Sequence, residues 1–584
     1  MKVLPHRWLI LLTIPFSSLA LSTTASSDAS CQATTGSSSS LTMAPADTVL
    51  DLAALTTKPI VYTIAGSDSG GGAGIQADLH AIHALGGHGC SAITCLTAQN
   101  SVGVSGVHAA TDFLDAQLQA LQTDLPPAAI KIGMLGTREL VEQVGTFVQD
   151  MKKKDGSRRI WVVLDPVMIS TSGHRLIQED AQQAMINMLF PYVDLLTPNK
   201  YEAEALLGRT LTSTADVEQG ARDLLAMGAR AVLIKGGHTQ EDSPYAQDYF
   251  LSSSSLQNLP EEPRNCDGGV WLRSERYDTV HTHGTGCTLS SALATALALQ
   301  STSWPTVVDL VDAATLAKAY VTAGIAQGVG LGQGPGPVGQ TIFPQTHQHF
   351  PRIVANPNEG QAQPFRPISM NDGLGHLLIL VDSLEWIEKL ASDKVKAAGV
   401  TDIQLRIKGE TDFDRIVEKV KTANRLCQAA GIRLWINDYW EAAIAAGCFG
   451  VHMGQEDLYR CQQKDGLSKL REANLALGLS THTYGELAAA LAVEPSYISL
   501  GPIYGTSSKQ VNFGPQGLAM VQQWRRLVPP HMPLVVIGGI SDAARAADVR
   551  RAGADCVAVI GAVTQAQETV QAIESLNAAV QSRA

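Results

Sequence analysis

Two segments of small residues in the first half of the chain could bind anions. The first, AGSDSGGGAGIQAD (65–78), follows an apolar strand-like run and opens a helix. The second, GTGCTLSSA (284–292), starts a helix that we expect to run to about Leu299. Free N–H groups and the helix dipole attract phosphate at such places. Cys287 lies in the first turn of this second helix, where the dipole is expected to lower the pKa of its thiol.

Charged residues at the ends of strand-like runs lie between these two segments in the sequence. Asp165 follows one run and Glu202 comes just after another, and Lys235 stands in a KGGH sequence. Carboxylates at strand ends can hold Mg²⁺, and a lysine can meet nucleotide phosphates. Each also has an ordinary explanation: Asp165 as a helix cap, Glu202 on a solvated helix face, Lys235 as a snorkelling side chain, Cys287 as a buried structural thiol. The chemical interpretation therefore rests on the whole set.

The second half carries a different set of polar residues. Gln404, Arg406 and Lys408 alternate along one strand-like run, so they share one face. If this face points into the interior of a barrel, the two cations would need an anionic partner, which suggests a diphosphate. The alternative is that the face lies on a solvated strand edge and binds nothing. Asp438 and Asp457 follow the next two strands and could share a Mg²⁺ that bridges diphosphate oxygens.

The elements that position these residues form two series. From Pro59 to about Gln327, strand-like runs such as 60–64 and 161–164 alternate with helical patterns, which predicts βαβ units and a mostly parallel sheet between helices. From Leu377 onwards, eight short runs, each followed by a helical pattern, predict a (β/α)₈ barrel with its chemistry at the strand ends. These runs are 377–381, 403–407, 433–436, 450–453, 475–479, 497–500, 533–537 and 556–560.

Composition narrows the classes of function. A chain of 584 residues with 45% hydrophobic and 5% aromatic residues fits two large α/β domains. The net charge of −12 is spread widely and gives no basic footprint for nucleic acid. Nine cysteines without CxxC spacing indicate domains built for a reducing compartment. We expect small-molecule substrates, no nucleic-acid or membrane partner, and leave a homo-oligomer open.

The N-terminus has a different character. Lys2, His6 and Arg7 precede an apolar run, 8–20, that resembles a signal peptide and is too short for a comfortable membrane span. Residues 21–45 are rich in Ser, Thr and Ala. A two-part leader that carries the protein to a complex plastid accounts for both features. Secretion, or translation from Met43 to give a cytoplasmic protein, are the alternatives.

The motifs of the first half, taken in order, resemble hydroxymethylpyrimidine (phosphate) kinase of the ribokinase-like superfamily over about 60–345. They are AGSDSGGGAGIQAD, LTAQNSVGVSGV, KIGML, VLDPVM, LTPNKYEAE, KGGH and HGTGCTLSSA. The resemblance implies a ribokinase-like αβα sandwich that uses ATP and Mg²⁺. It assigns the aminopyrimidine to Gly66, Asp78, Gln99 and Val167, phosphates to Lys235, Asn199, Gly284, Thr285 and Gly286, metal to Asp165 and Glu202, and activation of the substrate hydroxyl to Cys287.

The motifs of the second half resemble thiamine phosphate synthase over about 377–565. They are QLRIK, ND, VHMGQED, GLSTHT, GPIYGTSSK, VVIGGI and VAVIGAV. The resemblance implies a TIM barrel that displaces pyrophosphate from hydroxymethylpyrimidine diphosphate with the thiazole nitrogen. It assigns the pyrimidine diphosphate to Gln404, Arg406, Lys408, Asn437 and Lys509, Mg²⁺ to Asp438 and Asp457, a role near the reacting centre to Ser480, and the thiazole phosphate to Thr506, Ser508, Gly539, Ile560 and Gly561.

Two positions depart from the synthase pattern. Gly561 stands where the family usually has Ser, which removes a possible phosphate donor, and Ser508 stands where it often has Thr, which keeps the hydroxyl.

The two resemblances together predict a fused enzyme of thiamine biosynthesis. We expect a leader at 1–22, a Ser/Thr-rich segment at 23–57, the kinase domain at 58–345, a linker at 346–372 and the synthase domain at 373–584. Two alternatives remain open: a pyridoxal-type or broad vitamin kinase in the first half, or one half that is a catalytically silent sensor of thiamine precursors.

Overall fold

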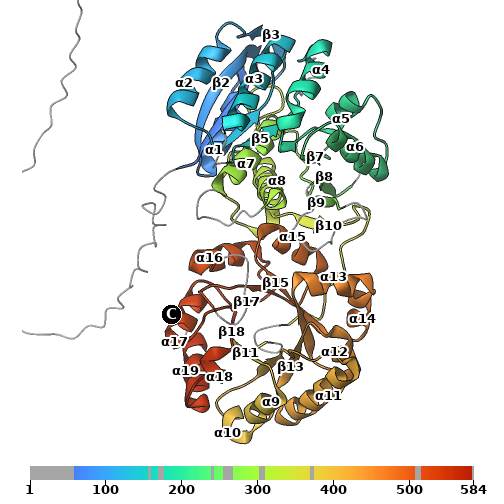
Figure 1. The fold of residues 1–584 in the computed structure, drawn as a ribbon, viewed down its shortest axis with the longest axis vertical. Helices are drawn as coiled ribbons and strands as arrows, with labels where there is room; N and C mark the ends of the chain where they lie inside the picture. The colour runs from blue at the N-terminus through green and yellow to red at the C-terminus, as the bar shows by residue number, and fades with distance from the viewer. Residues whose placement is uncertain are drawn as a thin grey trace, which may run out of the picture. The chain divides into compact units, whose positions relative to one another are not determined.

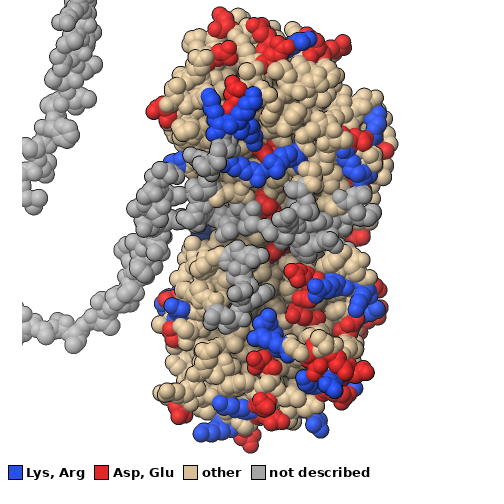
Figure 2. All heavy atoms as spheres, in the orientation of Figure 1, with Lys and Arg blue, Asp and Glu red and all other residues tan. Residues whose placement is uncertain are grey.

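The computed structural model describes residues 58–154, 159–168, 176–237, 243–253, 268–300, 309–368, 374–506 and 514–581, all within one compact unit. The expected leader and Ser/Thr-rich segment lie outside these ranges, as do Ser508 and Lys509. Among the described residues, no helix is long and apolar enough to cross a membrane. On the face drawn in Figure 2, acidic and basic side chains are interspersed.

A ten-stranded sheet organises the first half, in the order β10-β9-β8-β7-β6-β5-β4-β1-β2-β3. Its central strands are parallel, as the βαβ pattern predicted, and its outer strands are antiparallel. The parallel strands are β1 (Ile60–Asp68), β2 (His88–Gln99), β4 (Ala129–Ile132), β5 (Trp161–Leu164), β6 (Leu195–Leu196) and β7 (Ala231–Ile234). The antiparallel strands are β3 (Val104–Ala109), β8 (Tyr245–Ser252), β9 (Val270–Glu275) and β10 (Arg352–Val354).

Helices cover both faces of this sheet (Figure 1). Alternation along β1 sends Val61 to one apolar cluster and Tyr62 and Ile64 to the other, because successive strand residues face opposite sides. The first cluster is shared with α1 (Gly74–Ala84), α7 (Thr285–Leu299) and α8 (Leu310–Ala326). The second is shared with α2 (Leu114–Asp124), α3 (Arg138–Lys154), α4 (Glu179–Met188), α5 (Lys200–Leu207) and α6 (Thr214–Ala226). The first half is therefore an αβα sandwich.

The second half is a closed barrel of parallel strands, β11 to β18 in sequence order, which confirms the predicted barrel. Inward side chains such as Leu378, Trp435 and Tyr497 form the interior cluster. The strands are β11 (Leu377–Val381), β12 (Asp402–Leu405), β13 (Arg433–Asn437), β14 (Gly450–Met453), β15 (Ala476–Thr481), β16 (Tyr497–Leu500), β17 (Leu534–Ile537) and β18 (Cys556–Val559).

Each barrel strand is followed by helix. These helices are α9 (Leu384–Ala391), α10 (Asp393–Lys396), α11 (Phe413–Ala430), α12 (Trp440–Ala446), α13 (Gln455–Gln463), α14 (Gly466–Glu472), α15 (Tyr484–Val493), α16 (Gly517–Leu527), α17 (Ala543–Arg551), α18 (Gly561–Thr564) and α19 (Thr569–Gln581). Because all eight strands are parallel, their carboxyl ends meet at one face of the barrel, where the predicted second site should lie.

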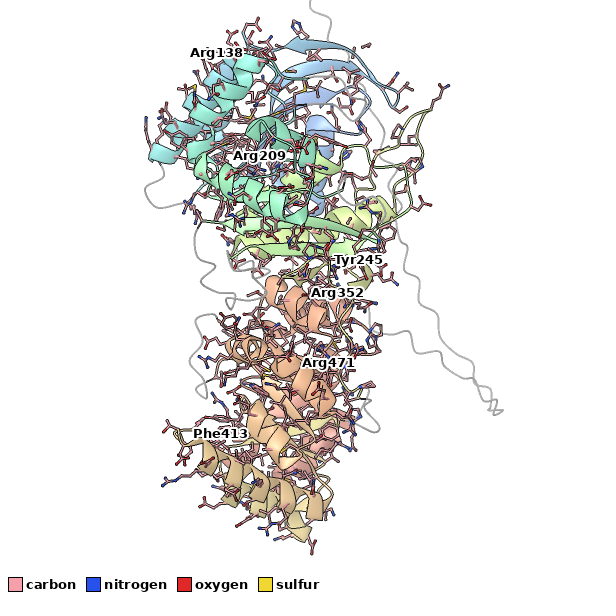
Figure 3. The ribbon with its side chains drawn as sticks, turned by 90° about the vertical axis from the view of Figure 1, so that its right-hand side faces the viewer. Arg138, Arg209, Tyr245, Arg352, Phe413 and Arg471 are labelled. Carbon is pink, nitrogen blue, oxygen red and sulfur yellow. The ribbon has the colours of Figure 1, made fainter. Side chains whose placement is uncertain are left out.

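The stretch 346–372, expected as a linker, is not all connecting chain. Its residues Arg352–Val354 form β10, which pairs antiparallel with β9. Arg352, labelled in Figure 3, also pairs with Glu494 of the barrel half. Ile353 is fully buried and anchors this edge strand in the apolar core. The surrounding Gly- and Pro-rich composition hid the strand in the sequence.

Candidate active sites

A cavity of about 670 Å³ opens at the carboxyl ends of the central strands of the sandwich. Thr97 and His283 line it, and so does nearly the whole predicted set for this half. That set comprises Gly66, Gln99, Asp165, Val167, Asn199, Glu202, Lys235, Gly284, Thr285, Gly286 and Cys287. Motif residues that are more than two hundred positions apart in the sequence thus line one cavity.

Two glycines allow the glycine-rich turn to pack against the start of α7. Gly284, with φ of 80°, precedes the helix, and a Cβ there would lie 1.9 Å from the carbonyl oxygen of Gly72. A Cβ at Gly74, with φ of 58°, would lie 2.3 Å from that of Gly66. Neither site can accept a side chain, because positive φ and backbone contact both oppose it. Gly284 offers no side chain to cap α7, and Thr285 N–H donates to the Thr282 carbonyl, so the next N–H groups of the first turn, at Gly286 and Cys287, face the cavity for an anion.

The thiol of Cys287 does not have the lowered pKa that the helix position predicted. Burial raises the pKa of Cys287 to about 11, and the Asp78 and Asp165 carboxylates push it the same way. The Lys131 ammonium and the Gly74 N–H oppose this shift without overcoming it. Loss of hydration therefore outweighs the helix dipole here, and the thiol is protonated at neutral pH.

Lys235 lies between two carboxylates. Its Nζ is 2.7 Å from Asp165 Oδ1 and 3.8 Å from Glu202 Oε2. Glu202 also closes a capping box with Asn199 at the start of α5. Burial raises the pKa of Glu202 to about 7, Lys235 opposes the shift and Asp165 adds to it. Within the described ranges no three or more acidic, His or Cys side chains are arranged so that they could hold a metal ion by themselves, so a metal here would take two carboxylates and ligands from elsewhere.

Asp78 is not on the wall of this cavity. Its carboxylate is fully buried and accepts from Lys131 Nζ at 2.7 and 2.9 Å, from Thr63 Oγ1 at 2.6 Å and from Ser291 Oγ at 2.8 Å. The residue that does reach the cavity is Lys131, which the sequence reasoning missed. A lysine inside the four-residue buried strand Ala129–Ile132 was the available signal, because an unpaired charge would not be tolerated there.

The second cavity, of about 440 Å³, lies at the carboxyl ends of the barrel strands. It gathers the predicted residues Gln404, Arg406, Asn437, Asp438, Asp457, Ser480, Thr506, Gly539, Ile560 and Gly561. Lys408 is exposed and is not among the lining residues. The alternation that predicted its inward orientation ends with β12 at Leu405, three residues earlier.

Amide and carboxylate groups form a chain along the cavity wall. Gln404 Nε2 donates to Asn437 Oδ1 at 2.7 Å, and the Asn437 amide donates to the Asp438 carboxylate. Asp438 has φ of 67°, an unusual backbone for a non-glycine residue, which occurs where a turn re-aims a side chain. Asp457 lines the same cavity, so two carboxylates face one space.

Three lining residues were missed on this side as well. His452 contacts Ser480 Oγ through Nε2 at 2.9 Å and Tyr497 OH through Nδ1 at 2.8 Å. Arg545 donates to the Gly539 carbonyl at 2.7 Å. The histidine stood in the quoted VHMGQED motif, but the contact with Tyr497 depends on strand register, which a single sequence does not give.

Comparison with known proteins matches each half. A family model described as phosphomethylpyrimidine kinase matches residues 68–339, and one described as thiamine monophosphate synthase matches 379–563. The chloroplastic thiamine biosynthetic bifunctional enzyme TH1 of Arabidopsis thaliana is 33% identical, over 82% of this chain and 85% of its own. The chain belongs to the family of bifunctional thiamine biosynthetic enzymes.

A second bifunctional relative and a single-domain kinase agree with this assignment. A probable bifunctional thiamine biosynthetic enzyme, chloroplastic, of Oryza sativa subsp. japonica is 32% identical over 83% of this chain and 81% of its own. The hydroxymethylpyrimidine/phosphomethylpyrimidine kinase of Haemophilus influenzae is 42% identical over 48% of this chain and 97% of its own. A Staphylococcus aureus pyridoxal kinase, solved with AMP-PCP and pyridoxal, is 29% identical over 48% of this chain and 93% of its own, with a TM-score of 0.40. The chain is thus a kinase fused to a thiamine phosphate synthase.

Proposed function

We propose that the kinase half transfers phosphoryl groups from ATP to hydroxymethylpyrimidine and then to its monophosphate, and that the synthase half couples the resulting diphosphate to thiazole phosphate. The products are thiamine phosphate and pyrophosphate. The observation that carries this is one chain with two separate cavities, each lined by the motif residues of one activity. Relatives named for the pyrimidine substrate favour it over a pyridoxal kinase.

In the kinase half, the start of α7 and Lys235 supply positive potential where the transferred phosphoryl group would carry charge. The Gly284–Gly286 backbone is fixed before any ligand arrives, so its donors need no reorientation. Cys287 follows directly and would orient the substrate hydroxyl. Since its thiol is protonated and phosphoryl transfer passes through a loose transition state, we assign it to alignment of the hydroxyl, whose proton would pass to an oxygen of the transferred phosphoryl group.

The acidic residues of both cavities fit Mg²⁺. Asp165 and Glu202 offer carboxylate oxygens beside the proposed phosphate position, and Asp438 and Asp457 do so in the barrel. Such hard oxygen donors suit Mg²⁺, which usually takes one or two carboxylates and completes its shell with water and substrate phosphates. The ion would neutralise phosphate charge, while Asn199 orients Glu202 through the capping box.

In the synthase half, the C–O bond from the pyrimidine methylene to the diphosphate breaks, and the thiazole nitrogen supplies the electron pair of the new C–N bond. The bonding pair leaves with pyrophosphate, so no side-chain nucleophile is needed. Gln404, Arg406 and Asn437 would hold the diphosphate, and Thr506 with Gly539 would face the thiazole phosphate. Alignment and stabilisation of the departing charge are the main tasks of the protein.

A coupled assay tests the proposal. The full chain, given hydroxymethylpyrimidine, ATP, Mg²⁺ and thiazole phosphate, is expected to form thiamine phosphate and release pyrophosphate. Pyridoxal replaces the pyrimidine in a parallel reaction and is expected to be turned over poorly. Absence of both nucleotide consumption and pyrophosphate release would refute both activities, and loss of only the second step would identify a silent synthase half.

We also propose that the protein works in a plastid, because the relatives from Arabidopsis and rice are named chloroplastic and the sequence begins with a leader-like segment. Residues 1–57 fused to a fluorescent protein are expected to reach the plastid, and a fusion that begins at Met43 is expected to stay in the cytoplasm. Secretion of the first fusion would contradict the proposal.

A further inference from the structure

His452, Gly478 and Tyr497 lie at the same level on three neighbouring barrel strands, and the glycine lets the other two side chains meet. In the strand register, His452 of β14 is the partner of Gly478 of β15, and Gly478 is the partner of Tyr497 of β16. Gly478 has no side chain to separate its neighbours. A Cβ there would lie 2.1 Å from the Tyr497 ring. The rings of His452 and Tyr497 stack across it, with centroids 5.7 Å apart and planes 18° from parallel.

The hydroxyl of Tyr497 sets the direction of the hydrogen bonds. Tyr497 is completely buried, and burial raises its pKa well above the usual value, so it remains a phenol. A buried O–H donates to an acceptor that lies within reach, and His452 Nδ1 lies 2.8 Å from it. The nearby Asp402 carboxylate already accepts from Arg433 and from Trp435 Nε1. Among the described residues, His452 Nδ1 is the acceptor within hydrogen-bond distance of the Tyr497 hydroxyl.

The direction of the bond from Tyr497 OH to His452 Nδ1 determines which imidazole nitrogen carries the proton. A neutral imidazole that accepts at Nδ1 carries its hydrogen on Nε2. His452 Nε2 lies 2.9 Å from Ser480 Oγ, so it donates to that oxygen. Because Ser480 Oγ accepts from the histidine, the hydrogen of Ser480 must point elsewhere. Ser480 lines the cavity, where the substrate would offer an anionic acceptor.

We propose that Tyr497 and His452 are positioning residues that hold the Ser480 hydroxyl as a hydrogen-bond donor to the departing diphosphate. The inference rests on the proposed synthase function. Negative charge grows on the diphosphate as the C–O bond breaks, so a donor fixed in advance lowers the barrier more than it strengthens substrate binding. Their role is positional, because the polar atoms of Tyr497 and His452 face each other and Ser480.

Tyr497→Phe removes the hydroxyl and keeps the ring stack. We expect kcat of the synthase to fall roughly tenfold, because the imidazole is no longer held in one tautomer and Ser480 is no longer oriented. The KM for pyrimidine diphosphate should stay within about twofold, and kinase turnover should be unchanged. A wild-type kcat in this variant would overturn the proposal.

Tyr484→Phe is the matched control. Tyr484 is also fully buried in the barrel half, but its hydroxyl has no hydrogen-bond partner among the described residues. We expect this variant to keep wild-type synthase kinetics. An equal loss in Tyr484→Phe and Tyr497→Phe would mean that a general packing effect, not the hydrogen-bond chain, controls turnover, and would also overturn the proposal.

Nitrogen NMR of the full chain labelled with ¹⁵N-histidine reads the tautomer directly. The His452 signals, assigned by their loss in His452→Gln, should report a proton on Nε2 in the wild type and a mixture in Tyr497→Phe. A proton on Nδ1 in the wild type would contradict the inference even if the synthase is active. An inactive wild type with the expected tautomer would instead refute the proposed function, so the two failures are distinguishable.

Discussion

The two cavities differ in how the polar groups around them are paired. In the kinase half, charges are paired inside the protein: Lys131 with Asp78, both fully buried, and Lys235 with Asp165 at 2.7 Å. On the barrel wall, uncharged groups are bonded to one another, as in Gln404 with Asn437. The kinase cavity thus has opposed charges paired in and behind its wall, whereas the barrel wall has neutral amides bonded to one another beside the charged residues Arg406, Asp438 and Asp457.

This difference predicts how each half responds to substitution. Removing one member of a buried ion pair leaves an uncompensated charge and costs far more than the pair contributes. A neutral hydrogen bond contributes only about 0.5–1.5 kcal/mol to stability, so its loss should be felt in activity before it is felt in folding. Stability and activity should therefore fall together in the kinase half and separately in the synthase half.

Lys131→Met should have the largest effect. It leaves the Asp78 carboxylate buried with only the Thr63 and Ser291 hydroxyls, and we expect a loss of about 3–5 kcal/mol in the stability of the kinase half. Calorimetry of the full chain measures this as a fall in the melting temperature. The double variant Lys131→Met/Asp78→Asn should recover most of the loss, because the stranded charge is gone.

Lys152→Met provides the control for this experiment. Lys152 pairs with Asp194 at 2.7 Å, but its side chain is 20% exposed and Asp194 keeps Arg159 at 3.2 Å. We expect a cost of less than about 1 kcal/mol. If Lys131→Met costs no more than Lys152→Met, the kinase half does not depend on a buried charge and the comparison fails.

Cys287→Ala should reduce kinase kcat by about 10²–10³ and leave synthase turnover unchanged, because the aligning group for the hydroxyl is lost. Cys287→Ser keeps a small neutral donor and acceptor and should retain clearly more activity than the alanine variant. Rates are measured with both pyrimidine substrates. Serine as inactive as alanine would show that a thiolate is required, and wild-type turnover in Cys287→Ala would remove the residue from the mechanism.

Asp438→Asn should lower synthase turnover by about 10² while leaving kinase turnover and the melting temperature close to wild type. The substitution keeps the shape and removes the charge proposed to hold Mg²⁺. Asp465→Asn is the control, since Asp465 also has positive φ, 53° against 67°, but does not line the cavity. A parallel loss of kinase activity would contradict the independence of the two active sites. A large loss of stability would contradict the expectation that activity and stability respond separately in the synthase half.

The fold was predictable because its signal is local. Each barrel strand is a short apolar run followed by a helical pattern, and four of the eight predicted runs end at the residue where the observed strand ends: 377–381, 450–453, 497–500 and 533–537. Strand β10 was missed, because three residues in a Gly- and Pro-rich stretch carry no periodicity. Its place depends on pairing with β9, which is a tertiary effect.

The sequence predicted the site residues well where motif residues stand at strand ends. It predicted them less well where burial of a side chain or the register between strands decides which groups meet. Asp78 was predicted to contact the substrate, but it is fully buried and does not line the cavity. Its partner Lys131 lines the cavity instead. The thiol of Cys287 was expected to have a low pKa, but burial outweighs the helix dipole. The contact of His452 with Tyr497 required the register across Gly478. The first two depend on how far from water a group lies and the third on strand register, and spacing alone gives neither.

Gly561→Ser should have the smallest effect, and it tests whether one more neutral donor strengthens phosphate binding in the barrel cavity. A Cβ at Gly561 would lie 3.3 Å from Gln565 Oε1, the far end of an exposed side chain that can move aside. The added hydroxyl should then lower the KM for thiazole phosphate by roughly threefold at constant kcat, as one more hydrogen bond allows. Gly561→Ala supplies the carbon without the hydroxyl and should leave the KM unchanged or raise it. If alanine lowers the KM as much as serine, the gain comes from packing, and a hydroxyl at this position is not a phosphate donor.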